Sequence, residues 1–217
     1  MELKGKKLLF LGDSITEGTG VNEEKNIYLN RICRMAGAAQ ALNYGIGGTS
    51  IARNKALGWR TGAFVVRAQT LPEEAWDADV AFIFGGTNDY GIGDGLFGEE
   101  DSCNPFEING ALNIIVQSLR GMNEKMRIVI ISPVRRQNEE APNAATGKPL
   151  KDYVELLRRA AERLSLPFCD LFHTDLFDPE DEAQRALYIP DGLHPNDDGH
   201  QRMAEALLKQ ITSIQEE

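Results

Sequence analysis

A serine near the start of the chain and an aspartate–histidine pair near its end are of the residue types that perform acyl transfer. Ser14 follows a glycine and an aspartate, and Asp191 precedes His194 by three positions, just before a predicted helix. At this spacing the carboxylate can contact one ring nitrogen and leave the other free as a base. The order Ser, Asp, His therefore supplies a nucleophile, an orienting acid and a base for serine acyl transfer. The pair alone is also typical of a capping aspartate beside a packed histidine.

Two further polar segments follow predicted strands. Residues 43–50 contain three glycines, so their backbone amides can approach a ligand closely. Residues 85–89 come directly after an apolar run and end in Asn88 and Asp89, whose side chains can hydrogen-bond a ligand. In a parallel sheet the carboxyl ends of the strands face one crevice, and the following helices point their N-termini into it. We therefore expect these segments to meet Ser14 at one edge of a sheet.

Short apolar runs alternate with amphipathic stretches along the chain, which is the pattern of βαβ units and a parallel sheet. The first run stops at Gly12, as a buried strand does when a turn follows it. Strands are expected at residues 8–11, 41–43, 80–84, 127–131 and 166–171. Helices are expected at residues 26–35, in a short stretch ending at 71, at 107–122 and 150–164, and after a cap at Asn196 or Asp197.

Length and composition limit the classes of protein that need to be considered. The 217 residues suit one α/β domain spanning residues 1–217. The 23 basic and 33 acidic residues give a net charge of −10, which argues against a docking surface for nucleic acid or anionic lipid. Cys33, Cys103 and Cys169 are widely spaced, so neither a zinc site nor a disulfide framework is predicted. The N-terminal apolar run is too short for a signal peptide and no stretch approaches membrane-spanning length, so we expect a cytoplasmic protein.

Residues 12–18, which read GDSITEG, resemble the first sequence block of the SGNH hydrolases, the superfamily of GDSL-like esterases and lipases. Residues 191–196, which read DGLHPN, resemble its last block. The resemblance implies that Ser14 is the nucleophile, that His194 is the base and that Asp191 orients the base. In that role His194 takes the serine proton during attack and returns it to the leaving alcohol.

The second and third blocks of this superfamily resemble the two polar segments described above. The resemblance aligns the oxyanion glycine with Gly48, and a shift of one position would place it at Gly47. It places the oxyanion asparagine at Asn88. The amides of Ser14 and Gly48 and the side chain of Asn88 would then converge on the oxygen that gains charge during acyl transfer. Each such donor can be worth roughly 3 to 4 kcal/mol in the transition state.

The resemblance also implies a fold and a reaction. The expected fold is a three-layer α/β/α domain with a five-stranded parallel sheet in the flavodoxin-like order 2-1-3-4-5. The expected reaction is hydrolysis of a carboxylic ester through an acyl-enzyme, with no metal and no organic cofactor. The expected partner is a small-molecule ester, and the oligomeric state is left open.

The substrate class is inferred from the loops that follow the strands and wall the expected site. These loops span residues 50–63, 90–106, 133–149 and 173–190. They are polar, and their candidate substrate contacts are Trp59, Arg60, Tyr90, Phe97 and Arg135. No long apolar lid is present. We therefore predict a short-chain or carbohydrate-linked acyl ester rather than a long-chain lipid.

Two functions without catalysis stay open at this point. The same glycines and helix N-termini suit a flavodoxin-like module that binds a nucleotide or phosphate. The fold also suits a non-catalytic carbohydrate-binding or interaction domain. Asp13 is expected to be a structural hydrogen-bonding residue, and His173 and His200, which lie outside the four blocks, are expected to be structural or exposed.

Overall fold

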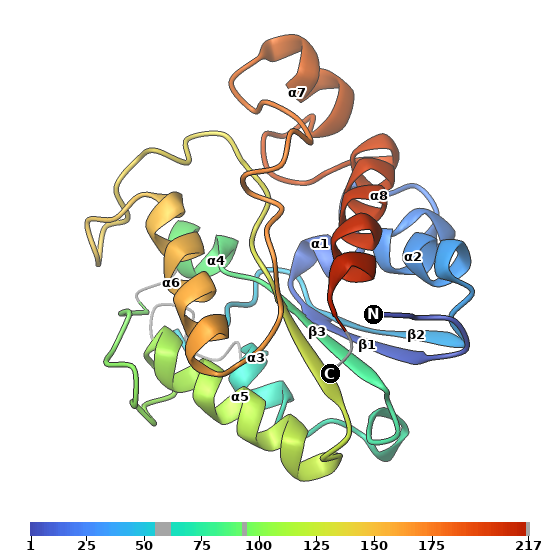
Figure 1. Cartoon of the computed structure of the whole chain (residues 1–217). Helices are drawn as coiled ribbons and strands as arrows, with labels where there is room; N and C mark the ends of the chain where they lie inside the picture. Colours follow the sequence, from blue (N-terminus) through green and yellow to red (C-terminus); the bar gives the residue numbers. More distant parts are fainter. Residues whose placement is uncertain (55–61, 93–94, 216–217) are drawn as a thin grey trace.

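A five-stranded parallel sheet forms the centre of the molecule (Figure 1). The computed structural model describes residues 1–54, 62–92 and 95–215. The strands follow one another in the order β2-β1-β3-β4-β5, which confirms the flavodoxin-like order expected from the sequence. They are β1 (Lys7–Gly12), β2 (Gln40–Gly45), β3 (Val80–Phe84), β4 (Arg127–Ile131) and β5 (Phe168–Cys169).

Side-chain alternation along the strands divides the core between the two faces of the sheet. In β1, Leu9 and Leu11 belong to one buried cluster, while Leu8 and Phe10 belong to the other. The first cluster is covered by α3 (Phe64–Arg67), α5 (Ile108–Met122) and α6 (Leu150–Arg163). The second is covered by α1 (Ser14–Glu17), α2 (Tyr28–Ala36) and α8 (Asp197–Ser213). The domain is therefore a three-layer α/β/α sandwich, as Figure 1 shows.

The register of the sheet places three turns side by side. Gly12, at the end of β1, pairs with Gly45 of β2 on one side and with Phe84 of β3 on the other. Because parallel strands in this register end at the same level, the segments that follow them leave the sheet together. These segments carry Ser14, Gly48 and Asn88, which explains how residues far apart in the chain come to share one edge.

Most predicted elements are present, and the differences have local causes. The strand expected at residues 166–171 is paired only over Phe168–Cys169, and it ends there because Ile131, the partner of Cys169, is the last residue of β4. A helix, α4 (Thr87–Gly91), occupies a stretch that was expected to be loop. A second unexpected helix, α7 (Glu182–Tyr188), buries none of its residues and so carries no apolar stripe. Short 3₁₀ turns at Glu24–Asn26 and Glu73–Ala75 complete the set of elements.

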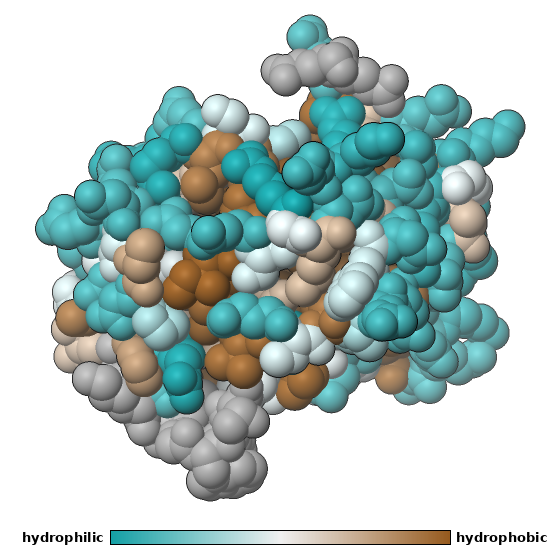
Figure 2. Space-filling model, turned by 90° about the horizontal axis from the view of Figure 1, so that it is seen from below, coloured by the Kyte–Doolittle hydropathy of each residue, from teal (hydrophilic) through white to brown (hydrophobic). Residues whose placement is uncertain are grey.

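The surface is mainly polar. Figure 2 shows hydrophilic residues over most of the face seen from below, with hydrophobic residues emerging in separate patches. The large hydrophobic side chains that are most exposed are Met35, Ile46, Trp76, Ile92, Leu96 and Leu187. Over the described ranges, no helix combines the length and the apolar character needed to cross a membrane.

Candidate active site

The turn after β1 presents Ser14 as the first residue of α1. Asp13 caps this helix, and its Oδ1 accepts the N–H of Ile15 at 3.0 Å. A Cβ on Gly12 would lie 1.9 Å from Oγ1 of Thr16, so only glycine fits where the strand becomes a helix. An N–H in the first turn of a helix has no acceptor within that helix. The N–H of Ser14 therefore stays available beside its own hydroxyl.

Ser14, His194 and Asp191 form one continuous chain of hydrogen bonds. The Oγ of Ser14 lies 3.0 Å from Nε2 of His194, and Nδ1 of His194 lies 2.6 Å from Oδ2 of Asp191. The other carboxylate oxygen of Asp191 accepts the backbone N–H groups of Leu193 and His194 at 2.9 and 2.7 Å. The structure thus brings together the three residues that the sequence nominated from opposite ends of the chain.

The charge on Asp191 determines the proton positions in this chain of bonds. Burial raises the pKa of Asp191, but hydrogen bonds from the backbone and ring of His194 and from Leu193 outweigh it, and the net pKa is lowered. An ionised carboxylate can only accept, so Nδ1 of His194 carries the proton. Nε2 of the neutral ring is then an acceptor, and the hydroxyl of Ser14 donates to it. This arrangement is the one that general-base activation of a serine requires.

Gly48 and Asn88 lie at the ends of the two neighbouring strands. Gly48 has a φ of 71°, in the left-handed region that favours glycine. The Nδ2 of Asn88 donates to the carbonyl oxygen of Thr49 at 2.8 Å, which joins the third block to the second. An amide group has two N–H donors, so one of them is left for a ligand. Among the described residues, the N–H groups of Ser14 and Gly48 also have no acceptor.

Comparison with known proteins places this arrangement in a family. The model of the GDSL-like Lipase/Acylhydrolase family matches residues 10–202. The chain belongs to this family. No curated protein matches it at a significant level. As a GDSL-like acylhydrolase, the protein is an ester hydrolase.

Solved structures agree with this assignment. A protein from Lactobacillus plantarum is 26% identical, with 98% of this chain and 99% of that chain covered and a TM-score of 0.78. A member of the lipolytic G-D-S-L family from Veillonella parvula DSM 2008 is 18% identical, with 96% of this chain and 99% of that chain covered and a TM-score of 0.62. At that lower identity the likeness is one of fold, and both structures share the α/β/α architecture described above.

Arg67 joins the nucleophile turn of this GDSL-like acylhydrolase to its glycine-rich loop. Its Nη2 donates to the carbonyl of Gly12 at 2.8 Å and to Oγ1 of Thr49 at 3.0 Å. Its Nη1 donates to the carbonyl of Tyr44, and its Nε donates to the carbonyl of Gly62 at 2.6 Å. Burial lowers the pKa of Arg67 to about 10, and the negative charges of Asp13 and Glu17 oppose this effect. No pattern in the sequence marks Arg67 as part of the site.

Two buried carboxyl groups, Asp13 and Asp89, support the loops of the site. Burial raises the pKa of Asp13 to about 7. Burial likewise raises the pKa of Asp89 to about 6, although Asp89 accepts the N–H groups of Ile51 and Ala52 at 2.9 and 3.1 Å. Both side chains therefore act mainly as hydrogen-bonding supports for the loops, as expected for Asp13.

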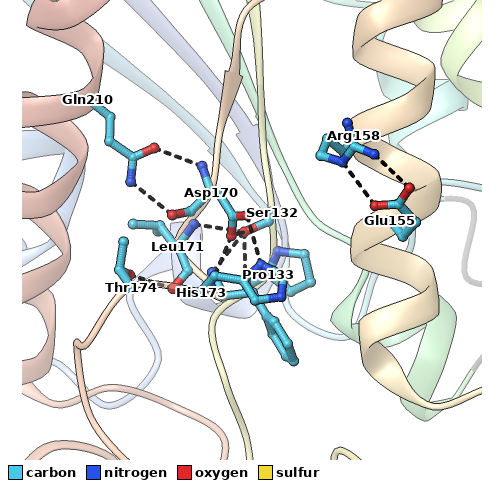
Figure 3. Close-up of polar contacts among 10 residues, drawn as sticks. Ser132, Pro133, Glu155, Arg158, Asp170, Leu171, His173, Thr174 and Gln210 are labelled. Carbon is cyan, nitrogen blue, oxygen red and sulfur yellow. Dashed lines mark hydrogen bonds and ion pairs between the residues drawn. The ribbon is translucent and has the colours of Figure 1, made fainter.

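A second serine, aspartate and histidine lie together at the ends of β4 and β5 (Figure 3). Asp170 and His173 repeat the spacing of the first pair, with Nδ1 of His173 2.8 Å from Oδ2 of Asp170. The Oγ of Ser132, however, accepts the N–H groups of Leu171 and Phe172 at 2.8 and 3.0 Å and is completely buried. Ser132 makes no hydrogen bond with His173 among the described residues. This cluster is structural. It shows that the aspartate–histidine spacing can occur without a hydrogen bond between the histidine and a serine.

The other histidine outside the blocks is also structural. His200 is fully buried, and its Nδ1 accepts the backbone N–H of Tyr28 at 3.0 Å at the start of α2. Burial lowers the pKa of His200 to about 3. The exposed His173 and the buried His200 confirm the expectation for both residues.

The candidate substrate contacts have different surroundings. Trp59 and Arg60 lie outside the described residues. The hydroxyl of Tyr90 is within 2.7 Å of the carbonyl oxygens of Asn138 and Ala141. Tyr90 therefore anchors one loop.

The other two candidate substrate contacts, Phe97 and Arg135, also interact with other side chains of the protein. The ring of Phe97 packs 4.9 Å from that of Tyr153. Arg135 pairs with Glu139 at 2.7 Å and with Asp178 at 3.4 Å. Its neighbour Arg136, which no sequence pattern marks, lies closer to the site, because its Nη1 donates to Oγ1 of Thr87 at 3.2 Å and Thr87 directly precedes Asn88.

Proposed function

We propose that this GDSL-like acylhydrolase hydrolyses a carboxylic ester through an acyl-enzyme on Ser14. His194 acts as the base, and Asp191 orients the base. The observation that carries the proposal is the 3.0 Å contact between Oγ of Ser14 and Nε2 of His194, continued by the 2.6 Å contact to Asp191. A binding module has no need of this chain of contacts, whereas a serine nucleophile depends on it.

Acylation begins when Oγ of Ser14 attacks the ester carbonyl carbon while its proton passes to Nε2 of His194. The carbonyl π electrons move to the oxygen, and a tetrahedral intermediate forms. Its collapse breaks the bond to the leaving alcohol oxygen, which takes the proton from Nε2. Water then attacks the acyl-enzyme in the same way, with His194 again taking and returning one proton. The products are the alcohol and the carboxylic acid, and Ser14 regains its proton.

Three N–H donors are proposed to stabilise the oxygen of the tetrahedral intermediate. They are the backbone amides of Ser14 and Gly48 and the second N–H of the Asn88 amide. The first two have no acceptor among the described residues, and the amide of Asn88 is held in place by Thr49. Donors that are already oriented before the reaction need no reorganisation when charge develops.

The proposed substrate is a short-chain or carbohydrate-linked acyl ester. Support comes from the polar composition of the loops expected to wall the site and from a surface that is mainly hydrophilic in Figure 2. A series of 4-nitrophenyl esters tests the chain length. We expect acetate or butyrate to be hydrolysed faster than laurate, and faster turnover of laurate would contradict the short-chain preference.

Labelling with a fluorophosphonate probe tests the nucleophile. The wild-type protein is expected to form a covalent adduct at Ser14, and Ser14→Ala is expected to lose both the label and the hydrolysis of 4-nitrophenyl acetate. Ser118→Ala is a suitable control, because Ser118 lies in α5 and donates to a helix carbonyl at 2.8 Å. Labelling that persists in Ser14→Ala would exclude the proposed mechanism. A wild-type protein that shows neither labelling at Ser14 nor hydrolysis would favour one of the non-catalytic functions.

A further inference from the structure

Arg136 lies beside the proposed catalytic groups without taking part in the steps above. Its chain neighbour Gln137 donates its N–H at 2.8 Å to the carbonyl of Gly192, in the loop of the proposed acid and base. Its own Nη1 donates to the carbonyl oxygen and the Oγ1 of Thr87 at 3.4 and 3.2 Å. Thr87 directly precedes Asn88 in α4. Arg136 therefore connects the acid–base loop with the helix that carries the proposed oxyanion amide.

Several N–H groups of the Arg136 guanidinium have no acceptor among the described residues. Neither its Nε nor its Nη2 has a hydrogen-bond partner among the described residues, and of these two nitrogens only Nε is sealed from solvent. No described carboxylate lies within ion-pair distance of the side chain. A guanidinium is always charged and has five N–H donors in a planar fork that matches a carboxylate. A half-buried cation in this state has the capacity to bind an anion.

The carboxylates nearest to Arg136 are already engaged by other groups. Asp191 accepts from His194 and its own loop, and Asp13 accepts from the first turn of α1. Glu139 pairs with the guanidinium of Arg135. From Arg136 it accepts the backbone N–H, at 2.9 Å, and not a side-chain N–H. Because each carboxylate has its own donors, none of them neutralises the Arg136 side chain by direct contact.

A small pocket adjoins this guanidinium. It has a volume of about 290 Å³, and its lining includes Tyr90, Ile92, Arg136, Asn138 and Pro142. Arg136 lies over the ring of Tyr90, 5.7 Å from its centre. A Cβ on Gly91 would lie 2.7 Å from Nη1, so the missing side chain leaves the space that the guanidinium occupies. The volume of the pocket is near the lower end of the range for small-molecule sites.

We propose that Arg136 binds a carboxylate carried by the ester substrate, an inference that rests on the proposed function of the site. The pocket beside Tyr90 adjoins the guanidinium and would hold the group that carries this carboxylate. The inference narrows the substrate class to short esters with a negative charge on either the acyl half or the alcohol half. It also distinguishes Arg136 from Arg135, whose charge is already paired.

Two matched pairs of esters test this inference. Monomethyl glutarate and methyl valerate differ by a carboxylate on the acyl half, and 4-acetoxybenzoate and 4-acetoxybenzamide differ by one on the alcohol half. Values of kcat/KM are compared for the wild-type protein, Arg136→Gln and Arg136→Lys. Arg159→Gln makes the same change in net charge on the exposed side of α6, where Arg159 pairs with Glu155 at 2.8 Å.

We expect the wild-type protein to prefer the charged ester of one pair by about tenfold, the size of one charge-assisted hydrogen bond. Arg136→Gln is expected to lose this preference, because its kcat/KM falls about tenfold more for the charged ester than for the neutral partner, and Arg159→Gln is expected to keep the preference. Arg136→Lys keeps a point charge but not the planar fork, so its preference is expected to fall to about threefold.

The inference is overturned if the wild-type protein prefers neither charged ester, or if the preference persists unchanged in Arg136→Gln. If Arg136→Gln does not fold, an unchanged preference in Arg136→Lys overturns it instead. Hydrolysis of neutral esters with no charge preference would leave the proposed function intact. A lack of any Ser14-dependent hydrolysis would overturn both.

Discussion

The side-chain amide of Asn88 donates to the carbonyl oxygen of Thr49 at 2.8 Å, so the end of β3 is tied to the loop that follows β2. This bond uses one of the two amide hydrogens and orients the other. It also explains why the third and second sequence blocks need to meet. In the proposed mechanism, this bond holds the two oxyanion donors, Gly48 and Asn88, in a fixed relative position.

Replacing Asn88 by alanine is expected to reduce kcat for 4-nitrophenyl acetate by about 10² to 10³ fold, because one donor to the tetrahedral oxygen is lost. KM is expected to change little, since the ground-state carbonyl is bound weakly. Steady-state kinetics measure both values. Asn30→Ala is the control, because Asn30 donates to the carbonyl of Glu24 at 2.7 Å on an exposed part of the molecule. A rise in KM with unchanged kcat would contradict the oxyanion role.

Asp191→Asn is expected to lower kcat by about 10³ to 10⁴ fold, because an amide in place of the carboxylate favours the wrong tautomer of His194. The chain has a matched control in Asp170→Asn. Asp170 contacts His173 at 2.8 Å with the same spacing but without a contact between that histidine and a serine. Activity of Asp170→Asn within about twofold of wild type would show that the effect belongs to Asp191. Equal losses in both variants would indicate a general loss of folding.

Arg67→Met is expected to lower kcat by about 10 to 100 fold with a small change in KM, because Arg67 holds the carbonyls of Gly12 and Tyr44 together. Binding of phenylboronic acid, which forms a tetrahedral adduct with a serine, is expected to weaken in parallel with kcat. Arg127→Met is a control at the far end of β4, where Arg127 donates to the carbonyl of Gln215 at 3.2 Å. Unchanged boronate affinity in Arg67→Met would contradict a role in positioning the donors.

Asp13 is expected to make stability depend on pH. Burial raises its pKa to about 7 from an ordinary value of 3.8. Between these values the folded protein keeps a proton that the unfolded chain has lost. The free energy of unfolding therefore falls as pH rises from about 4 to about 7, by up to roughly 1.4 kcal/mol per pH unit. Asp89 acts with the same sign up to about pH 6, because its pKa is also raised.

Asp13→Asn removes this contribution and keeps an oxygen that can cap α1. Its free energy of unfolding is expected to decline less steeply than that of wild type over the same interval. Urea denaturation at several pH values between 4.5 and 7.5 measures the difference. Asp101→Asn, at an exposed position, is expected to follow the wild-type curve. Parallel curves for wild type and Asp13→Asn would contradict the raised pKa.

Elements with a continuous apolar run could be predicted closely. The strands at Val80–Phe84 and Arg127–Ile131 have the bounds expected, because both faces of a central parallel strand are buried and only apolar residues satisfy them. The helix α7 was missed because none of its residues is buried, so no periodic pattern marks it. The edge strand β5 is shorter than its apolar run, because a strand can pair only as far as its neighbour extends. Here Cys169 pairs with Ile131, where β4 ends.

The same division applies to the site. Ser14, Asp191 and His194 could be nominated from residue type and local spacing, since a turn and an aspartate–histidine pair are set by neighbours in the chain. Arg67 and Arg136 could not, because an isolated arginine has no distinguishing pattern in a sequence. Their importance comes from the carbonyl and hydroxyl groups that the sheet order brings within reach. The sequence alone therefore predicted the residues whose role depends on near neighbours in the chain. The contacts between distant residues were decided only by the tertiary structure, because the parallel strands end at the same level and bring their following segments together.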